Sequence, residues 1–457
     1  MVGLFSTLSG AAYALGAQGF GMEVAGQNIA NVNTEGYARR QAQLAERPTP
    51  YGMGGVEILG VRSTRDAFID SRLRNELPAQ SFDSTRSNAL SVVETTLGSI
   101  GSSIDGSMSA LFKSFSDLST NPQSAVYRDG VVQNANHLAS SINELAKSFA
   151  SSAQQADSDV RLDVQQINTL SSQIAQLNQR IGDANGGEDV SALKDQLSTA
   201  VQSLSKLARV SIVTQPQGTI DVSLGAGRQL VVGTSNYSLS VSNAPVTGKA
   251  QIRYGSTDIT SEMTDGSIGA ELDIRDNTIP AYQQKLDQLA YDLTQQVNAV
   301  HTTGYDASGT AGGSFFQPIA TVTGAAAAFK VAPAIAANSS KIAASGTGAV
   351  GNNQTAVALA ALRDAKVASG NTSTFVESWS VLVGQVGTDA SVARNSLETR
   401  NGVVSAIQTL ADSASGVSLD EEAANLIKFQ RAYEANAKFF SAIDSVLTTL
   451  MSSVGVS

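Results

Sequence analysis

The sequence predicts a mainly α-helical protein with long helices, a coiled coil formed by the two chain ends, and an inserted β-region. Three observations support this fold class. Both ends carry apolar residues at alternating spacings of three and four, the pattern of a coiled-coil seam. Between them, residues 86–115 and 124–181 are nearly free of helix breakers. From Val210 the apolar period changes to two, which is typical of strands.

The N-terminal stretch predicts one amphipathic helix. Its seam consists of Leu4, Leu8, Ala11, Leu15, Gln18, Met22, Ala25 and Ile29. Asn28, Asn31, Asn33 and Gly36 then mark a break, because asparagine and glycine tolerate left-handed turns. No Lys or Arg precedes Arg39, and no run approaches the roughly eighteen apolar residues of a membrane span. We therefore expect neither a secretory signal nor a transmembrane helix.

The interior predicts a helical body around strands. After a strand at 54–62, the expected helices lie at 66–74, 86–115, 124–181, 193–207, 280–300, 355–366 and 374–413. Asn185, Gly186 and Gly187 end the long helix expected at 124–181. Short alternating runs between residues 210 and 241 predict strands, and residues 305 to 351 predict a small irregular excursion rich in Gly and Ala. The lone Trp379 lies on a helical face with Phe375 and is expected in the core.

The C-terminal stretch predicts the partner of the first helix. Ser418 and Glu421 have the spacing of a capping box, and Asp420, Glu421 and Glu422 compensate the helix dipole. The seam consists of Leu426, Phe429, Tyr433, Asn436, Phe440, Ile443, Leu447 and Leu450. One such seam buries too few side chains to offset the entropy of ordering about thirty residues, so each helix alone should fray.

This order of elements predicts nested domains. The terminal helices are outermost in the chain, a helical body lies between them, and the strands are inserted within the body. The expected domains are a terminal coiled coil of residues 1–40 with 416–457, a helical body of 41–208 with 273–415, and a β-region of 209–272.

The composition argues against most kinds of active site. Charged residues make up 15% of the chain and the net charge is −10, without the basic face that a nucleic-acid binder needs. There are no cysteines, which excludes disulfides and thiolate metal sites. The two histidines, His137 and His301, are expected to pack or cap rather than to bind a metal. Asp306 to Gly309 begins like a calcium loop but lacks the downstream glutamate. We predict no catalytic, cofactor-binding or metal-binding residues, no cofactor, and no enzymatic activity.

Several stretches together resemble a known family. Residues 25–40 are similar to the N-terminal signature of bacterial flagellar axial proteins, the rod, hook and hook-associated proteins, although Glu35 stands where that signature usually has proline. Further stretches resemble the hook-associated members. These are residues 54–62, 66–74, 118–122, 272–276, 297–301, 315–316 and 425–438.

The resemblance implies a structural subunit that joins hook to filament and whose paired end helices line a tube. It implies unfolded export through the flagellar type III route to the cell exterior. The implied partners are identical subunits, hook protein, hook-associated protein 3, and a chaperone that covers the C-terminal helix; neither nucleic acid nor membrane insertion is expected. The expected assembly residues are Leu4, Leu8, Leu15, Met22, Ile29, Asn28, Asn31, Asn33, Gly36, Tyr37, Leu426, Phe429, Tyr433, Asn436, Phe440, Ile443, Leu447 and Leu450. The alternatives are another axial protein, such as hook or distal rod, or a secreted adhesin or hydrolase with axial-type ends.

Overall fold

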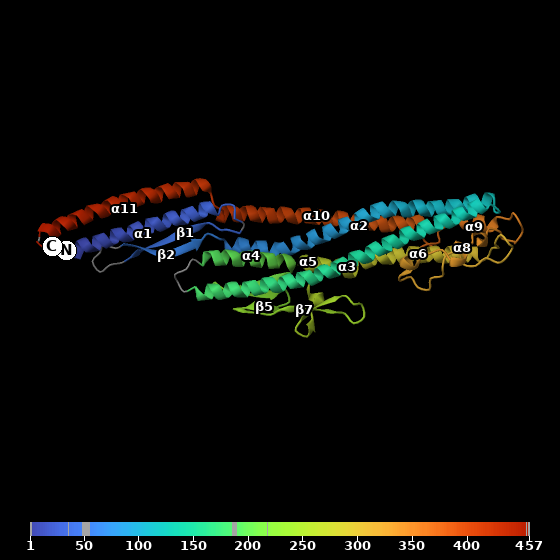
Figure 1. Ribbon diagram of the computed structural model, residues 1–457, viewed down its shortest axis with the longest axis horizontal. Coiled ribbons are helices and arrows are strands. Elements are labelled where there is room, and N and C mark those ends of the chain that lie inside the picture. Colours follow the sequence, from blue (N-terminus) through green and yellow to red (C-terminus); the bar gives the residue numbers. More distant parts are fainter. Residues whose placement is uncertain are drawn as a thin grey trace.

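The structure is a computed structural model that describes residues 2–34, 36–47, 55–184, 190–216, 218–453 and 455. The molecule is elongated: its first and last helices lie side by side at one end, and the long body helices extend to the other (Figure 1). This confirms the predicted mainly α fold with inserted strands. In the described ranges, no helix combines the length and apolar character needed to cross a membrane.

The elements follow the predicted order along the chain. The α-helices are α1 (Val2–Ala30), α2 (Ala67–Thr120), α3 (Ala125–Asp183), α4 (Ser191–Leu207), α5 (Gly266–Asp273), α6 (Ile279–His301), α7 (Ala325–Ala328), α8 (Pro333–Ala337), α9 (Gln354–Ala361), α10 (Phe375–Ser415) and α11 (Leu419–Ser453). The strands are β1 (Arg40–Arg47), β2 (Gly55–Ser63), β3 (Val210–Thr214), β4 (Ile220–Leu224), β5 (Gln229–Val232), β6 (Ser235–Asn236), β7 (Leu239–Asn243), β8 (Ala250–Tyr254) and β9 (Thr257–Asp258). Short 3-10 turns at Thr260–Glu262 and Ser339–Lys341 and a π-helix, η2 (Ile274–Thr278), complete the list.

A hairpin covers one side of α1. Strands β1 and β2 pair antiparallel, with Arg40 opposite Ser63. The guanidinium of Arg47 lies 4.5 Å from the ring centre of Tyr13 on α1, and any side chain at Gly55 would touch that ring. The sequence predicts β2 but not β1, because β1 has only three apolar residues and becomes a strand through its pairing with β2.

Helix α2 is continuous, whereas the sequence predicts two separate helices in this stretch. Asp66 caps its start by accepting hydrogen bonds from two backbone N–H groups of the first turn. Pro78 lies inside the helix and removes one backbone donor. The helix passes through it because Leu73 and Leu77 are buried against α10 just before the proline, and Leu90 is buried in the main core beyond it.

The main core lies in the body, at the end of the molecule away from α1. It joins α2, α3, α6 and α10 with the excursion between α6 and α9. Its large side chains include Phe112 and Phe375, whose rings stack 5.8 Å apart, and Trp379, which is buried as predicted. The excursion consists of short helices and isolated bridges and contributes Phe315 and Phe316 to this core.

The inserted strands form two small antiparallel sheets, ordered β3-β4-β5-β6 and β7-β8-β9. A second core packs them against the C-terminal half of α3 and against α4. Residues 266 to 273 form α5, a correction to the β-region that we predict up to residue 272. Gly266 starts this helix at φ +75°, with Leu207 so close that no side chain would fit. The predicted break at 185–187 lies outside the described residues.

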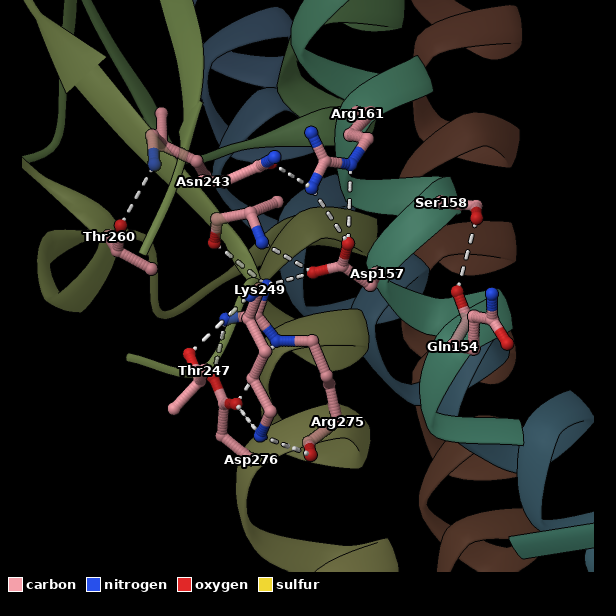
Figure 2. A network of polar contacts seen from close by, with 12 residues as sticks. Gln154, Asp157, Ser158, Arg161, Asn243, Thr247, Lys249, Thr260, Arg275 and Asp276 are labelled. Atoms are coloured by element: carbon pink, nitrogen blue, oxygen red, sulfur yellow. Dashed lines mark hydrogen bonds and ion pairs between the residues drawn. The ribbon is translucent and has the colours of Figure 1, made fainter. Parts of the chain in front are cut away.

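A polar network fixes the second sheet to the body (Figure 2). Asp157 of α3 accepts a hydrogen bond from the backbone N–H of Ala250 at 2.6 Å and one from Arg275 Nη1 at 2.7 Å. Arg275 is buried in the π-helix and also binds Asp276, which in turn accepts a bond from Lys249 at 2.8 Å. Buried charges held by several hydrogen bonds set one geometry, so the insert is tied to the body at a defined angle.

Candidate assembly interface

The terminal helices α1 and α11 run antiparallel. Asn28 of α1 meets Glu422 at the start of α11, and Gly21, seven residues earlier, meets Phe429, seven residues later. A Cβ atom on Gly21 would lie 2.6 Å from Phe429 Cε1, so the phenyl ring packs directly on the α1 backbone. The two ends of the chain are therefore paired, with the large side chain on α11 and the small residue on α1.

The predicted α11 seam lies against α1 over most of its length. Ile443 and Leu447 are buried, and Leu426, Phe429, Asn436 and Phe440 are partly buried. Tyr433 and Leu450 differ, because 41% and 40% of their surfaces are exposed. Only one stripe of α11 meets α1, and these two residues lie at its edge.

The predicted α1 seam matches the buried residues in part: Ala11 and Ala25 are buried, and the other buried positions each lie one residue before a predicted seam residue. The buried residues of this helix are Ala11, Ala17, Gly21, Val24, Ala25 and Asn28. The predicted Leu4, Leu8, Leu15, Met22 and Ile29 are only partly buried. Small residues occupy the contact because α1 is covered by α11 and also by the hairpin, which brings two backbones close to it. The signal that sequence reasoning missed is the spacing of Ala17, Gly21 and Val24.

Asn28 is the centre of a polar cluster where the terminal pair joins the body. Its side-chain Nδ2 donates to the Arg40 carbonyl at 2.8 Å and to Glu422 Oε2 at 3.0 Å. Its Oδ1 accepts from the Tyr37 hydroxyl at 2.8 Å and from the Arg40 backbone N–H at 2.9 Å. The amide is fully buried and all four of its hydrogen-bonding positions are used. We call Asn28, Tyr37, Arg39, Arg40, Arg65, Asp195 and Glu422 the joint.

Arg39 ties the joint to the start of α11. Its Nε donates to Glu422 Oε1 at 2.8 Å, its Nη1 lies 3.0 Å from Glu421 Oε2, and its backbone N–H donates to the carbonyl of Ser415. Of the two capping-box bonds predicted here, the described residues form only one, from the Glu421 N–H to the Ser418 hydroxyl at 3.5 Å. The Glu421 and Glu422 carboxylates face Arg39, so the ion pair adds to the dipole effect that we predict for them.

Asp195 of α4 ties the joint to the body. It lies 3.4 Å from Arg40 Nη2 and 3.0 Å from Arg65 Nη2. Burial raises the pKa of Asp195, against the opposing effect of the two arginines. Gly36 turns the chain at φ +78°, and a side chain there would collide with Thr199 of α4. The predicted break after α1 is therefore a docking turn as well as a helix end.

The other predicted residues of the turn have smaller roles. Asn31 is partly buried and donates to the Gln27 carbonyl at 2.9 Å, while Asn33 is exposed. Glu35 lies outside the described residues. A cleft of about 750 Å³ separates this turn from α3 and α4 beside the joint. Polar contacts, rather than a continuous apolar core, therefore hold the terminal pair to the body here.

Much apolar surface of the terminal pair is left uncovered. Exposed large side chains on α11, α1 and the hairpin are Leu419, Ile427, Tyr433, Phe439, Val446, Leu450, Met451, Phe5, Tyr13, Leu44, Ile58 and Leu59. Large apolar side chains exposed in this number on one pair of helices and a hairpin favour protein–protein contact. Across the described ranges, no three His, Asp or Glu side chains are placed to hold a metal ion. The arrangement favours binding to protein partners.

Comparisons with known proteins point to one family. Residues 90–316 match a family model described as the flagellar hook-associated protein FlgK helical domain, and residues 410–453 match the flagellar basal body rod FlgEFG protein C-terminal model. Flagellar hook-associated protein 1 of Bacillus subtilis (strain 168) is 26% identical over 100% of this chain and 99% of its own length. Its counterpart from Salmonella typhimurium is 26% identical over 98% of this chain and 99% of its own length.

A solved structure shares the fold. The flagellar hook junction protein FlgK from Burkholderia pseudomallei matches with a TM-score of 0.67 at 19% identity. The match covers 75% of this chain and 99% of that chain.

Proposed function

This chain belongs to the flagellar hook-associated protein 1 family, and we propose that its paired end helices are the part that assembles. It is a structural protein of the bacterial flagellum at the junction of hook and filament. The observation that carries the proposal is the terminal pair, which joins both chain ends at one extremity (Figure 1) and leaves many large apolar side chains exposed.

The burial of α11 supports assembly through contacts with further subunits. This helix has 35 residues, of which only Glu422, Ile443 and Leu447 are buried. A helix with so few buried contacts gains little stability from its own chain. Identical subunits packed around the terminal pair would cover the remaining apolar residues, so self-assembly supplies the missing burial.

The proposed partners follow from a position between hook and filament. We propose hook protein on one side and hook-associated protein 3 on the other. Inside the cell, an export chaperone covers the exposed apolar face of α11, which prevents early association. Unfolded export through the type III route then carries the chain outside the cell. The absence of cysteine supports this route, because no disulfide has to be broken or formed on the way.

We propose that the protein works without catalysis. What supports the proposal is that the matched relatives are named as flagellar structural proteins. The relatives that match over their whole length are hook-associated proteins, which favours a junction subunit over the hook, distal rod, adhesin or hydrolase alternatives.

Truncation tests the proposed role directly. Deleting the last thirty residues, from Lys428 onward, should abolish swimming while hooks still assemble, because the terminal pair is lost but hook protein is intact. Motility assays and electron microscopy of the flagella measure both outcomes. Normal swimming by the truncated strain would contradict the assignment.

A finer variant separates the α11 seam from the rest of the helix. Phe429→Asp with Phe440→Asp places two charges against α1 and should block incorporation into flagella. Gln430→Asp with Ser441→Asp adds the same charge at exposed positions and serves as the control. Incorporation of the first double variant at the level of the control would refute the pairing role.

A further inference from the structure

His301 is a fully buried histidine whose two ring nitrogens both hold backbone groups. It lies at the C-terminal end of α6 with 0% of its surface exposed. Its Nδ1 is 2.7 Å from the Gly313 carbonyl oxygen, and its Nε2 is 2.8 Å from the backbone nitrogen of Ala343. A carbonyl can only accept and an amide N–H can only donate, so Nδ1 carries the proton and Nε2 is unprotonated. The neutral ring is therefore the form that fits.

The two bonds fasten both arms of the excursion to the end of α6. Gly313 and Ala343 lie thirty residues apart on the stretch between α6 and α9. Tyr305 and Ser345 exchange backbone hydrogen bonds of 2.7 and 3.2 Å, which closes this stretch into a loop near the ring. His301 also packs on Phe315, with 5.4 Å between the ring centres. The histidine thus holds a loop that contributes Phe315 and Phe316 to the main core.

The surrounding charges disfavour a second proton on the ring. Burial, together with the positive charge of Arg128 on α3 and against the raising effect of the Gly313 bond, lowers the pKa of His301 to about 4. Arg128 is itself fixed by the carbonyls of Pro122, Ser340 and Ile342. From the excursion, Asp306 offsets part of the Arg128 charge, and Lys341 lies close to Asp306. No carboxylate contacts the ring itself among the described residues.

We propose that His301 is an acid-sensitive latch, which releases the segment around Ala343 from the end of α6 when the ring takes up a second proton, while Nδ1 can still donate to the Gly313 carbonyl. Protonation would place an N–H group on Nε2 directly opposite the Ala343 N–H, so the acceptor would be replaced by a donor. It would also leave a charge in a site without solvent. The least costly response is a local opening at the Ala343 side of the loop, because Phe315 and Phe316 keep the rest of the excursion in the main core.

A titration of the wild-type chain tests the latch without any variant. The sequence has two histidines, so isotope-labelled histidine gives two imidazole signals, and His137→Gln assigns them. His301 should stay neutral with the proton on Nδ1 from pH 8 to 5, and should protonate near pH 4. Protonation of His301 in the ordinary range near pH 6.5 would overturn the proposal.

Loop release is measured separately with spin labels. The chain has no cysteine, so Gln284→Cys on α6 and Ser340→Cys near Ala343 give two specific labels at exposed positions. The distance between them should be narrowly distributed at pH 7 and should broaden as His301 protonates, while helical circular dichroism is retained. A distribution that stays narrow after protonation would contradict the latch.

A matched pair of variants assigns the release to this ring. His301→Gln keeps an acceptor at the end of the side chain but does not titrate. The distance distribution between the two labels in this variant should therefore stay narrow at pH 4. His137→Gln removes the other, exposed histidine, and the distance distribution of this labelled variant should broaden as that of the wild type does. Equal broadening in both variants would show that another group controls the loop. If His301→Gln does not fold, the wild-type titration and distance measurement still decide the question.

Discussion

Two adjacent glutamates at the start of α11 show how burial sets the value of a contact. Both carboxylates reach Arg39, yet Glu422 is 2% exposed and the side chain of Glu421 is 62% exposed. Glu422 also accepts a hydrogen bond from Asn28, so its removal leaves two donors without an acceptor. Exposed ion pairs contribute about 0–1 kcal/mol, whereas breaking a buried pair costs several times more.

This difference gives a prediction for the joint. Glu422→Ala should weaken the attachment of the terminal pair by about 2–4 kcal/mol, because a buried donor left unpaired is costly. Local opening should then increase by roughly tenfold or more. The rate of limited proteolysis near residues 30–42 measures this local opening. Glu421→Ala is the matched control and should stay within about twofold of the wild type. Equal rates for the two variants would contradict the assigned role of the joint.

A second residue-scale prediction concerns Glu271, which is buried on α5. Its Oε2 has no hydrogen-bond partner among the described residues. Burial, then the nearby Asp163 and Asp159, raise its pKa to about 9 from an ordinary 4.5. Folding therefore takes up a proton between those pH values. The stability that this group supports is fully present below pH 4.5 and is lost as the pH rises toward 9.

Removing this carboxyl should flatten the pH dependence. The unfolding free energy of Glu271→Gln should exceed that of the wild type by an amount that grows between pH 5 and 8, at up to about 1.4 kcal/mol per pH unit. Urea unfolding at several pH values measures it, with the same substitution at exposed Glu144 of α3 as the control. A gain that does not change with pH would show that Glu271 is not protonated in the fold.

At the scale of elements, the contact between α1 and α11 depends on the glycine at position 21. Gly21 has three Phe429 ring atoms within 2.8 Å of where its Cβ would lie, whereas Gly26 on the same helix has nothing within 4 Å. Alanine is favoured over glycine in a helix by about 0.8–1.0 kcal/mol. The same substitution should therefore have opposite effects at the two sites.

This contrast is the element-scale prediction. Gly26→Ala should raise the helical content of the terminal pair, whereas Gly21→Ala should push Phe429 away and lower it. Circular dichroism measures the helical content of each variant, and the temperature of the first unfolding step measures the stability of its terminal pair. The packing of Phe429 on α1 would be refuted if the two variants gained helix equally.

The elements also show what sequence patterns could and could not predict. The long helices α3, α6 and α10 follow from apolar spacing and from the lack of breakers, and they are confirmed. Strand β1 was missed because its pairing partner, not its composition, makes it a strand. The continuity of α2 through Pro78 depends on burial against α10, which lies more than 300 residues away in the chain and leaves no local signal.

The candidate interface could be predicted only in part, because a sequence pattern shows apolar spacing within one helix but not the contacts between distant stretches. The seam of α11 is visible because large apolar residues mark it. The contact stripe of α1 is marked by alanine and glycine, which carry little hydrophobic signal, so the predicted stripe matches the buried residues only in part. The roles of Arg39, Arg40 and Glu422 in the joint could not be predicted, because they arise only when residues almost 400 positions apart meet.

At the scale of the whole molecule, stability is unevenly distributed. The body has two large cores and several buried ion pairs, including the network of Figure 2. The terminal pair has one narrow seam and a polar joint, with its apolar outer face open. We expect such a molecule to have a rigid body and marginal ends, and we expect the ends to become ordered when copies pack around them.

Hydrogen exchange followed by mass spectrometry tests this account most directly, on the dilute chain and on chains incorporated in flagella. We expect the amides of α1 and α11 to exchange orders of magnitude faster than those of α2 and α3 in the dilute chain, and to become protected after assembly. Terminal helices that are protected as strongly as α2 and α3 in the dilute, unassembled chain would contradict it.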